Sequence, residues 1–251
     1  MSQYFNNLLS SQDLTIAEIQ TLQNLRTEIQ TQLSVLSGNP RFYYAGSYSK
    51  GSMIRTRYDL DIVIYWPHTT ISSLETIYSA VGNVLRRHWK FVNPKTVCWE
   101  IPFSNGFHID VVPGRALDST FLNANLYRSD KKSSLKTSLK THIDKVKKSG
   151  RLPVIRLMKL WKERRQIPFH KSFLLELMTI EGCAGKNYDD FPGQLMACFG
   201  YIRDNIENYT FNDPANSNNN LLEDLNHSER KKIKTAAENA IAAESWNQLF
   251  V

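Results

Sequence analysis

Hydrophobic residues recur every three or four positions over residues 15–37, which is the spacing of one face of an α-helix. Both ends of this pattern are marked. Thr15 and Glu18 have the spacing of an N-terminal capping box, while Gly38 and Pro40 are typical of a helix terminus. The sequence therefore predicts a long amphipathic helix near the start of the chain.

Shorter apolar runs follow this helix, and several of them alternate apolar with polar positions. They predict strands at about 41–45, 60–66, 97–103 and 106–112, with a helix at about 71–88 between the second and third strands. This first part of the chain is thus expected to form a sheet with helices packed on it.

From about residue 133 the pattern is helical to the end of the chain. A helix is predicted over residues 151–165, where Pro153 suits the first turn, and the last helix is predicted at about 228–246. The Asn-rich stretch 216–220 is predicted to be a cluster of turns. A mixed sheet followed by helices indicates an α+β fold. We expect a sheet lobe over residues 1–130, including the first helix, and a helical lobe over residues 131–251.

Composition narrows the class of protein. The 251 residues are 41% hydrophobic, which is enough for a large core, and no run of 18 apolar residues predicts a membrane span. The N-terminal residues lack the pattern of a signal peptide. Cys98, Cys183 and Cys198 are widely spaced among apolar residues, so we expect free buried thiols in a reducing cytoplasm. The six histidines form no sequence motif for zinc.

Positive charge is concentrated in the middle of the chain. Residues 131–165 contain 13 Lys and Arg against two acidic residues, a local net charge of +11 in a chain whose total is +7. Such a stretch suits polyphosphate or a nucleic-acid backbone, although many basic runs are only solvated helix surfaces. Within residues 151–165, Arg156, Lys159 and Lys162 recur every third position and could meet a triphosphate.

Three aspartates lie at or within two predicted strands. Asp59 and Asp61 point to the same side of an extended segment, where they repel each other unless a cation lies between them. Asp110 lies in a second apolar strand, in which aspartate is uncommon. If the two strands are neighbours, three carboxylates converge on one site. Hard divalent ions prefer such oxygen ligands, and Mg²⁺ is favoured where phosphates complete the coordination.

The stretch GSYSKGS before these aspartates, residues 46–52, has the glycine spacing of a P-loop but lacks its lysine at position 52, so a P-loop ATPase is not expected. Taken with the aspartates, the stretch instead resembles polymerase-beta-like nucleotidyltransferases. Within that superfamily it is most similar to the cyclic-oligonucleotide synthases (the CD-NTase group) and to the oligoadenylate synthetases. The resemblance covers roughly residues 40–245 and includes segments 151–165, 170–178 and 211–225.

The resemblance implies a bilobal enzyme with its active site in the cleft between the lobes. It implies that Asp59, Asp61 and Asp110 bind the metal ions and are catalytic. It further implies that Gly46, Ser47 and Lys50 lie at the phosphates. In the helical lobe it assigns Lys159 and Ser172 to the phosphates and Phe173 to base stacking, where the family more often has Tyr. Core packing is the other interpretation of Phe173.

The resemblance implies a Mg²⁺-dependent enzyme, with Mn²⁺ as the other candidate cofactor. Its substrates would be NTPs: ATP, and GTP, UTP or CTP as further candidates. Its product would be a cyclic di- or oligonucleotide messenger in antiviral signalling, and an activating protein or nucleic acid is compatible with this reading. The alternatives are a linear oligoadenylate, nucleotide addition to an RNA 3′ end, or a catalytically idle nucleotide sensor. The sequence does not specify the bases, the linkage, the ring size, the activator, the oligomeric state or the effector.

Overall fold

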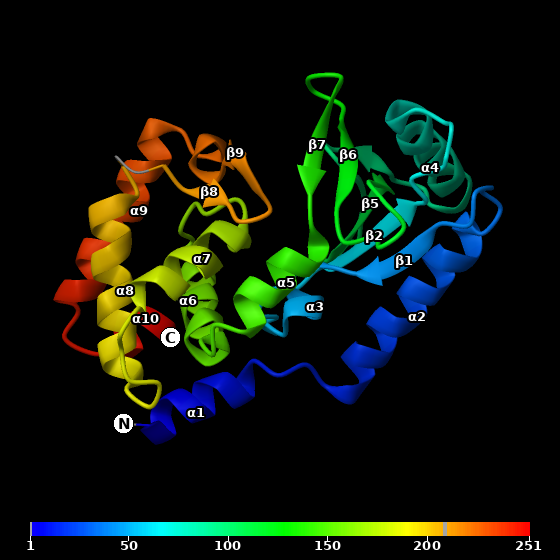
Figure 1. Cartoon of the computed structure of the whole chain (residues 1–251). Helices are drawn as coiled ribbons and strands as arrows, with labels where there is room; N and C mark the ends of the chain where they lie inside the picture. The colour runs from blue at the N-terminus through cyan, green and yellow to red at the C-terminus, as the bar shows by residue number, and fades with distance from the viewer. Residues whose placement is uncertain (1, 208–209) are drawn as a thin grey trace. The chain divides into compact units, whose positions relative to one another are not determined.

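The structure is a computed structural model that describes residues 2–207 and 210–251, and it divides into two compact units (Figure 1). The sheet unit spans Leu14–Lys50 and Tyr58–Ile143. The helical unit spans Met1–Asp13, Gly51–Arg57 and Asp144–Val251. The α+β fold expected from the sequence is confirmed. In the described part of the chain, no helix combines the length and the hydropathy that a membrane crossing requires.

The sheet unit is built on a mixed sheet. Within the described residues this sheet has seven strands in the order β1-β2-β5-β4-β3, with β6 pairing with β5 and β7 with β6. Strands β2 and β5 are parallel, and every other strand pair among the described residues of this sheet is antiparallel. The strands are β1 (Arg41–Tyr44), β2 (Leu60–Trp66), β3 (Asn93–Pro94), β4 (Trp99–Pro102), β5 (His108–Ala116), β6 (Ala124–Arg128) and β7 (Ser133–Thr137).

Two helices pack on this sheet. Helix α2 (Ile16–Leu33) contacts β2, helix α4 (Leu74–His88) contacts β5 and β6, and the two helices contact each other. The predicted capping box of α2 is present, with Thr15 accepting from the backbone N–H of Glu18 and the Glu18 side chain accepting from Thr15. The short helix α3 (Gly46–Lys50) joins β1 to the segment before β2. Helix α5 (Leu139–Lys147) follows β7.

The helical unit surrounds a large apolar core. Its elements are α1 (Ser2–Ser11), α6 (Leu152–Arg164), α7 (Ser172–Gly182), α8 (Phe191–Asn205), the hairpin of β8 (Asn212–Asp213) and β9 (Asn216–Asn220), the 3-10 helix η1 (Leu221–Asp224), α9 (His227–Ala242) and α10 (Asn247–Phe250). Phe5, Trp161, Phe199 and Phe250 are among the fully buried side chains. Helix α6 has Pro153 in its first turn, as predicted. All three cysteines are free and buried.

Several sequence-based predictions of local structure were wrong. Residues 133–137 form strand β7 rather than the start of a helical region, because they pair with β6 along its whole length. Residues 216–220 form strand β9 in a hairpin rather than a set of turns. Helix α1 was not predicted. In each case the segment is polar or short, so that long-range pairing or packing decides its conformation more than its own pattern does.

Candidate active site

A row of carboxylates crosses three adjacent strands of the sheet. Asp61 on β2 lies opposite Asp110 on the parallel strand β5, and Glu100 on β4 lies opposite Asp110 on the other side. Directly opposed residues share a face of a sheet, so the three side chains point the same way. The predicted convergence of Asp61 and Asp110 is therefore present, and Glu100 extends the row.

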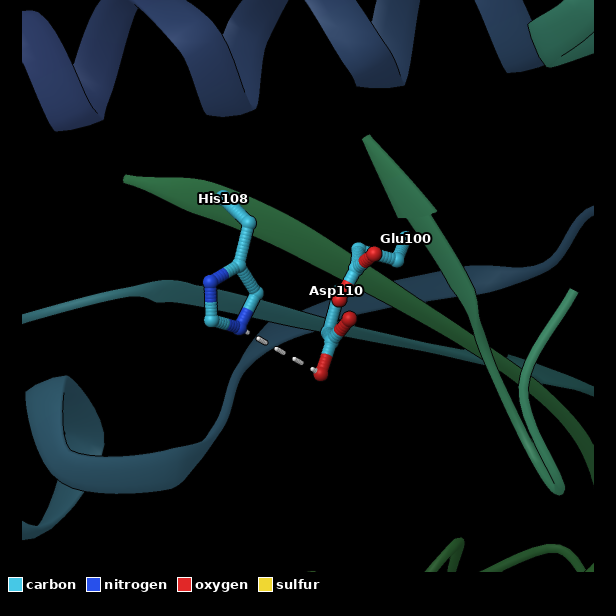
Figure 2. Close-up of side chains that lie close together, drawn as sticks. All are labelled: Glu100, His108 and Asp110. Carbon is cyan, nitrogen blue, oxygen red and sulfur yellow. Dashed lines mark ion pairs between the residues drawn. The ribbon is translucent and has the colours of Figure 1, made fainter. Parts of the chain in front are cut away.

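Asp59 reaches the same cluster from just before β2. Its Oδ1 lies 2.8 Å from Nδ1 of His108, the first residue of β5. The other ring nitrogen, Nε2, lies 4.0 Å from Oδ2 of Asp110. Because His108 is two residues before Asp110, both side chains occupy one face of the strand (Figure 2). His108 thus links Asp59 to Asp110.

The backbone of Gly46 lies directly against the carboxylate of Asp61. Gly46 has a positive φ of 53°, and a Cβ atom placed on it would overlap the Asp61 carboxylate. Gly46 is the first residue of helix α3, which contains Ser47 in its first turn and ends at Lys50. The buried Lys50 is near enough to Asp61 to favour the ionised form of that carboxylate. Gly46, Ser47 and Lys50 therefore belong to the same part of the sheet unit as the aspartates.

The electrostatics of the cluster are those of crowded anions. Burial and the charge of Asp110 raise the pKa of Asp61 to about 6, against the opposing effect of Lys50. Burial also raises the pKa of Asp110, although His108 and a hydrogen bond from Cys98 oppose this. The hydrogen bond to Asp59 raises the pKa of His108. The site therefore attracts cations strongly once its carboxylates ionise.

These residues fit a divalent metal ion. The Oδ1 atom of Asp110 is buried and has no hydrogen-bond partner among the described residues, which is costly unless a ligand occupies that position. Oxygen donors from Asp59, Asp61 and Asp110 are the type that Mg²⁺ and Mn²⁺ select. Figure 2 shows a second donor set around Asp110, with Glu100 and His108 close to it.

The other predicted site residues lie in the helical unit. Lys159 on α6 is buried, and its Nζ lies 3.4 Å from Oε1 of Glu176 on α7. Glu176 is fully buried and also accepts a hydrogen bond of 2.6 Å from Ser52. Lys159 is thus an interior cation with an anionic partner, a contact that the sequence did not predict.

The other two cations of the predicted stripe also have protein partners. Arg156 donates to the backbone oxygen of Met53 and forms an ion pair with Asp13. Lys162 lies 2.9 Å from Glu163 and 3.5 Å from the hydroxyl of Ser172. On this helix the periodic cations fix α1, α7 and segment 51–57 within the helical unit.

Ser172 and Phe173 occupy the first turn of α7. Ser172 is half-buried beside Lys162, and Phe173 is half-buried against the core of the helical unit. Contact of Phe173 with the core is therefore observed. The binding roles of Lys159, Ser172 and Phe173 stay predictions.

Sequence reasoning did not assign Glu100, His108 or Glu176 to a site. The signal that picked out Asp110, an acidic residue inside a predicted strand, was also present at Glu100. His108 shares the face of Asp110 by simple alternation. For Glu176 no local signal existed, because its partners come from residues far away in the chain.

The comparisons with known proteins agree with this geometry. Residues 40–113 match the family model described as "Cyclic GMP-AMP synthase DncV-like, nucleotidyltransferase domain", which covers the segment from β1 through Asp110. The chain is also 26% identical over 181 residues to the cyclic AMP-AMP-AMP synthase of Escherichia coli strain MS 115-1. That match covers 64% of this chain and spans 56% of the relative's length.

Solved structures share the fold over nearly the whole chain. The E. coli MS115-1 CdnC structure with ATP has a TM-score of 0.74 at 22% identity, covering 100% of this chain and 95% of that one. The Vibrio cholerae di-nucleotide cyclase DncV has a TM-score of 0.79 at 15% identity, covering 97% and 92%. The CD-NTase CdnG of Bradyrhizobium diazoefficiens has a TM-score of 0.77 at 12% identity, covering 99% and 95%. The chain therefore has the nucleotidyltransferase fold of the CD-NTase group, and the resemblance to that group found in its sequence is confirmed.

Proposed function

We propose that the chain is a Mg²⁺-dependent nucleotidyltransferase that joins NTPs into a cyclic di- or oligonucleotide and releases pyrophosphate. The observation that carries this proposal is the pairing of Asp61 with Asp110 on parallel neighbouring strands, with Asp59 at the same cluster. Two half-buried like charges that lie opposite each other in a sheet are costly unless a cation lies between them. The family match over residues 40–113 supports the same conclusion.

The roles of the residues follow from their positions. Asp59 and Asp61 would hold both ions, one of which would carry the donor triphosphate. Asp110 would hold the catalytic ion and help to deprotonate the acceptor ribose hydroxyl. Bound Mg²⁺ supplies charge stabilisation for the attacking and leaving oxygens of an in-line displacement. Gly46 leaves room for the carboxylate of Asp61, and Ser47 and Lys50 would contact the phosphates.

The choice of substrate rests on the relatives. The curated relative is a synthase of cyclic AMP-AMP-AMP, and solved structures with the same fold contain ATP or GTP. We therefore propose ATP as one substrate and leave the second base to experiment. The alternatives are a linear oligoadenylate and nucleotide addition to an RNA 3′ end.

A protein activator is part of the proposal. CdnC of E. coli MS115-1 has been solved in complex with HORMA-deltaN. By analogy we propose that this chain works in the cytoplasm, in antiviral signalling, and responds to a protein or nucleic-acid activator.

The test of the proposed activity is product analysis. The full chain is incubated with labelled NTPs and Mg²⁺, and the products are treated with phosphatase. A cyclic product has no terminal phosphate and survives unchanged, whereas a linear product changes mobility. If no NTP is joined, with or without a candidate HORMA-type activator, the proposed activity is wrong.

The metal-binding carboxylates give the matched control. The double substitution Asp59→Asn and Asp61→Asn removes two charges at nearly constant volume, so we expect loss of nucleotidyl transfer in a protein that still folds. Circular dichroism and the melting temperature of the apo protein check the fold. Undiminished transfer by this variant would exclude the mechanism.

The nucleotide-binding role of Lys159 needs a separate measurement. If Lys159 contacts phosphates, Lys159→Ala should raise KM with less effect on kcat, by about ten- to a hundredfold for one lost charge-assisted hydrogen bond. An unchanged KM for every NTP, together with a lower melting temperature, would make Lys159 a structural partner of Glu176 only.

A further inference from the structure

A histidine and two carboxylates gather at one end of strands β4 and β5. Figure 2 shows Glu100, His108 and Asp110, one from β4 and two from β5, and each offers a ligand atom within 4.8 Å of the other two. Glu100 and Asp110 are opposite each other in register, and His108 shares their face. Of these three residues, only Asp110 has a role in the proposed reaction.

The imidazole is oriented as a metal ligand. Its Nδ1 is 2.8 Å from Asp59 Oδ1, and its Nε2 is directed toward Asp110 at 4.0 Å. Histidines that bind metals commonly donate their other ring N–H to a carboxylate, which fixes the tautomer and leaves the second nitrogen free to coordinate. Here the carboxylate of Asp59 lies beside Nδ1, so Nε2 is the ring nitrogen that is directed toward Asp110.

The two ligand atoms are close enough to share an ion after a small movement. A separation of 4.0 Å is too long for a hydrogen bond. Two ligands that each lie about 2.1 Å from one tetrahedral ion are about 3.4 Å apart, so the two side chains would close by roughly half an ångström to bind it. The buried Oδ1 of Asp110, which has no hydrogen-bond partner among the described residues, provides a further donor on the same carboxylate.

Glu100 is the weaker member of the set. Asn93 donates to its Oε1 at 3.0 Å, and the ammonium group of Lys95 lies 2.8 Å from its Oε2. Each carboxylate oxygen can accept more than one contact, so coordination remains open to Glu100. Because Lys95 already neutralises part of its charge, Glu100 should add less to metal affinity than His108 does.

We propose that Glu100, His108 and Asp110 bind a transition-metal ion such as Zn²⁺ through one imidazole nitrogen and two carboxylates, and that this ion competes with Mg²⁺ by using Asp110. Imidazole is a good ligand for zinc, cobalt and nickel, whereas Mg²⁺ prefers oxygen. The same carboxylate therefore serves two classes of metal, and His108 decides between them. The competition, but not the binding, rests on the proposed function.

The binding experiment uses Co²⁺ as a coloured substitute for Zn²⁺. The full chain, stripped of metal and free of nucleotide, is titrated with Co²⁺ while its visible absorption is recorded, and Zn²⁺ is then added to displace it. We expect one Co²⁺ per chain with an absorption band that indicates nitrogen ligation. His108→Gln should weaken this binding by about tenfold or more, since even loss of an outer partner of a metal ligand costs ten- to a hundredfold.

The control is His88→Gln, which removes an exposed histidine of α4 in the same unit and should leave the Co²⁺ affinity unchanged. Glu100→Gln should cause a smaller loss than His108→Gln. Melting of each apo variant, followed by circular dichroism, shows that it is folded. Equal Co²⁺ affinity in wild type and His108→Gln would overturn the proposed site.

The competition is tested on the ratio of nucleotidyl transfer with and without Zn²⁺ at fixed excess Mg²⁺. We expect Zn²⁺ to inhibit the wild type and His88→Gln, with inhibition shifted to at least about tenfold higher Zn²⁺ in His108→Gln. If Co²⁺ binds through His108 but Zn²⁺ does not inhibit, the competition is wrong and the metal site stands. If the chain joins no NTPs, the proposed function fails while the titration still decides the site.

Discussion

Gly46 determines how closely the chain can approach the carboxylate of Asp61. Its φ of 53° favours glycine, and its contact with Asp61 leaves no space for a side chain. The resemblance of the sequence to nucleotidyltransferases indicated a Gly-Ser turn at this place, but only the folded chain shows that the carboxylate of Asp61 fills the space that a side chain at position 46 would occupy. Residues whose chemistry is visible in the sequence were thus predicted, and the contacts between them were not.

We expect Gly46→Ala to abolish nucleotidyl transfer, because the added methyl group displaces Asp61. Gly106→Ala is the matched control, since Gly106 also has a positive φ, 83°, but a Cβ atom there meets nothing within 4 Å. Each substitution carries about 1–2 kcal/mol of backbone strain. Urea unfolding of the two variants measures the backbone strain, and their transfer rates measure the effect of the contact with Asp61. Equal transfer rates for Gly46→Ala and Gly106→Ala would show that this contact is unimportant.

The raised pKa of Asp61 makes the stability of the metal-free protein depend on pH. The folded-state pKa of about 6 exceeds the ordinary value of 3.8, so Asp61 favours the folded state below pH 4, and this contribution is lost as the pH rises through 6. The shift corresponds to at most about 3 kcal/mol. Relative to Asp61→Asn, the apo wild type should therefore become less stable between pH 4 and pH 7.

Thermal melts of both proteins across this pH range, in EDTA, check the expectation. Asp118→Asn should behave in the opposite sense, because hydrogen bonds from Thr120 lower the pKa of that exposed carboxyl. Saturating Mg²⁺ should raise the melting temperature of the wild type at pH 7, but not that of Asp61→Asn. Parallel melting curves for wild type and Asp61→Asn in EDTA would contradict the effect of burial on Asp61.

At the scale of elements, periodicity located the long helices and the central strands. Strand β2 begins and ends where it was predicted, because its apolar run is continuous and buried. Strands β6 and β7 were missed because they are short and gain their conformation from pairing with each other and with β5. The ion pairs of the α6 cations were not predicted, because Asp13 is far from α6 in the sequence and Glu176 lies on another helix. Asp13 pairs with Arg156, and Glu176 pairs with Lys159.

The Lys159–Glu176 pair gives a test at this scale. Glu176→Gln would leave the buried ammonium of Lys159 without its anion, and we expect a loss of about 3 kcal/mol in the free energy of unfolding. Glu181→Gln on the same helix is the control. Glu181 pairs with Lys145 at the surface, where both side chains are about 40% exposed, and such pairs contribute less than about 1 kcal/mol.

Urea unfolding measures both variants. A loss for Glu176→Gln no larger than that for Glu181→Gln would show that Lys159 does not need its partner, and would favour the nucleotide-binding role for that lysine.

At the scale of the whole molecule, the sequence predicted one boundary near residue 130, whereas the compact units are interleaved. Residues 1–13 and 51–57 belong to the helical unit, although the first segment precedes the sheet unit in the sequence and the second interrupts it. Segment 51–57 joins the helical unit through Ser52 with Glu176 and through Met53 with Arg156. Such long-range partners cannot be read from local periodicity.

The distribution of positive charge bears on whether the product is a cyclic nucleotide or an extended RNA. An enzyme that extends RNA needs an open track of cations, and with six to ten phosphate contacts its affinity falls about 10³- to 10⁵-fold between 50 and 200 mM salt. In residues 131–165, cations at 145, 148, 156, 159 and 162 form ion pairs within the protein. This leaves less charge for an RNA backbone than the sequence suggested.

We therefore expect phosphatase-resistant product from NTPs alone, with no primer, and a KM that changes by less than about tenfold between 50 and 200 mM KCl, because a triphosphate releases far fewer counterions than an RNA track. A variant with Lys131, Lys132 and Lys147, all exposed, replaced by Gln should retain this activity. Transfer that requires an RNA 3′ end and collapses both in this variant and at 200 mM KCl would instead establish the RNA-extending alternative. The triple variant and the salt series must agree for either product class to be accepted.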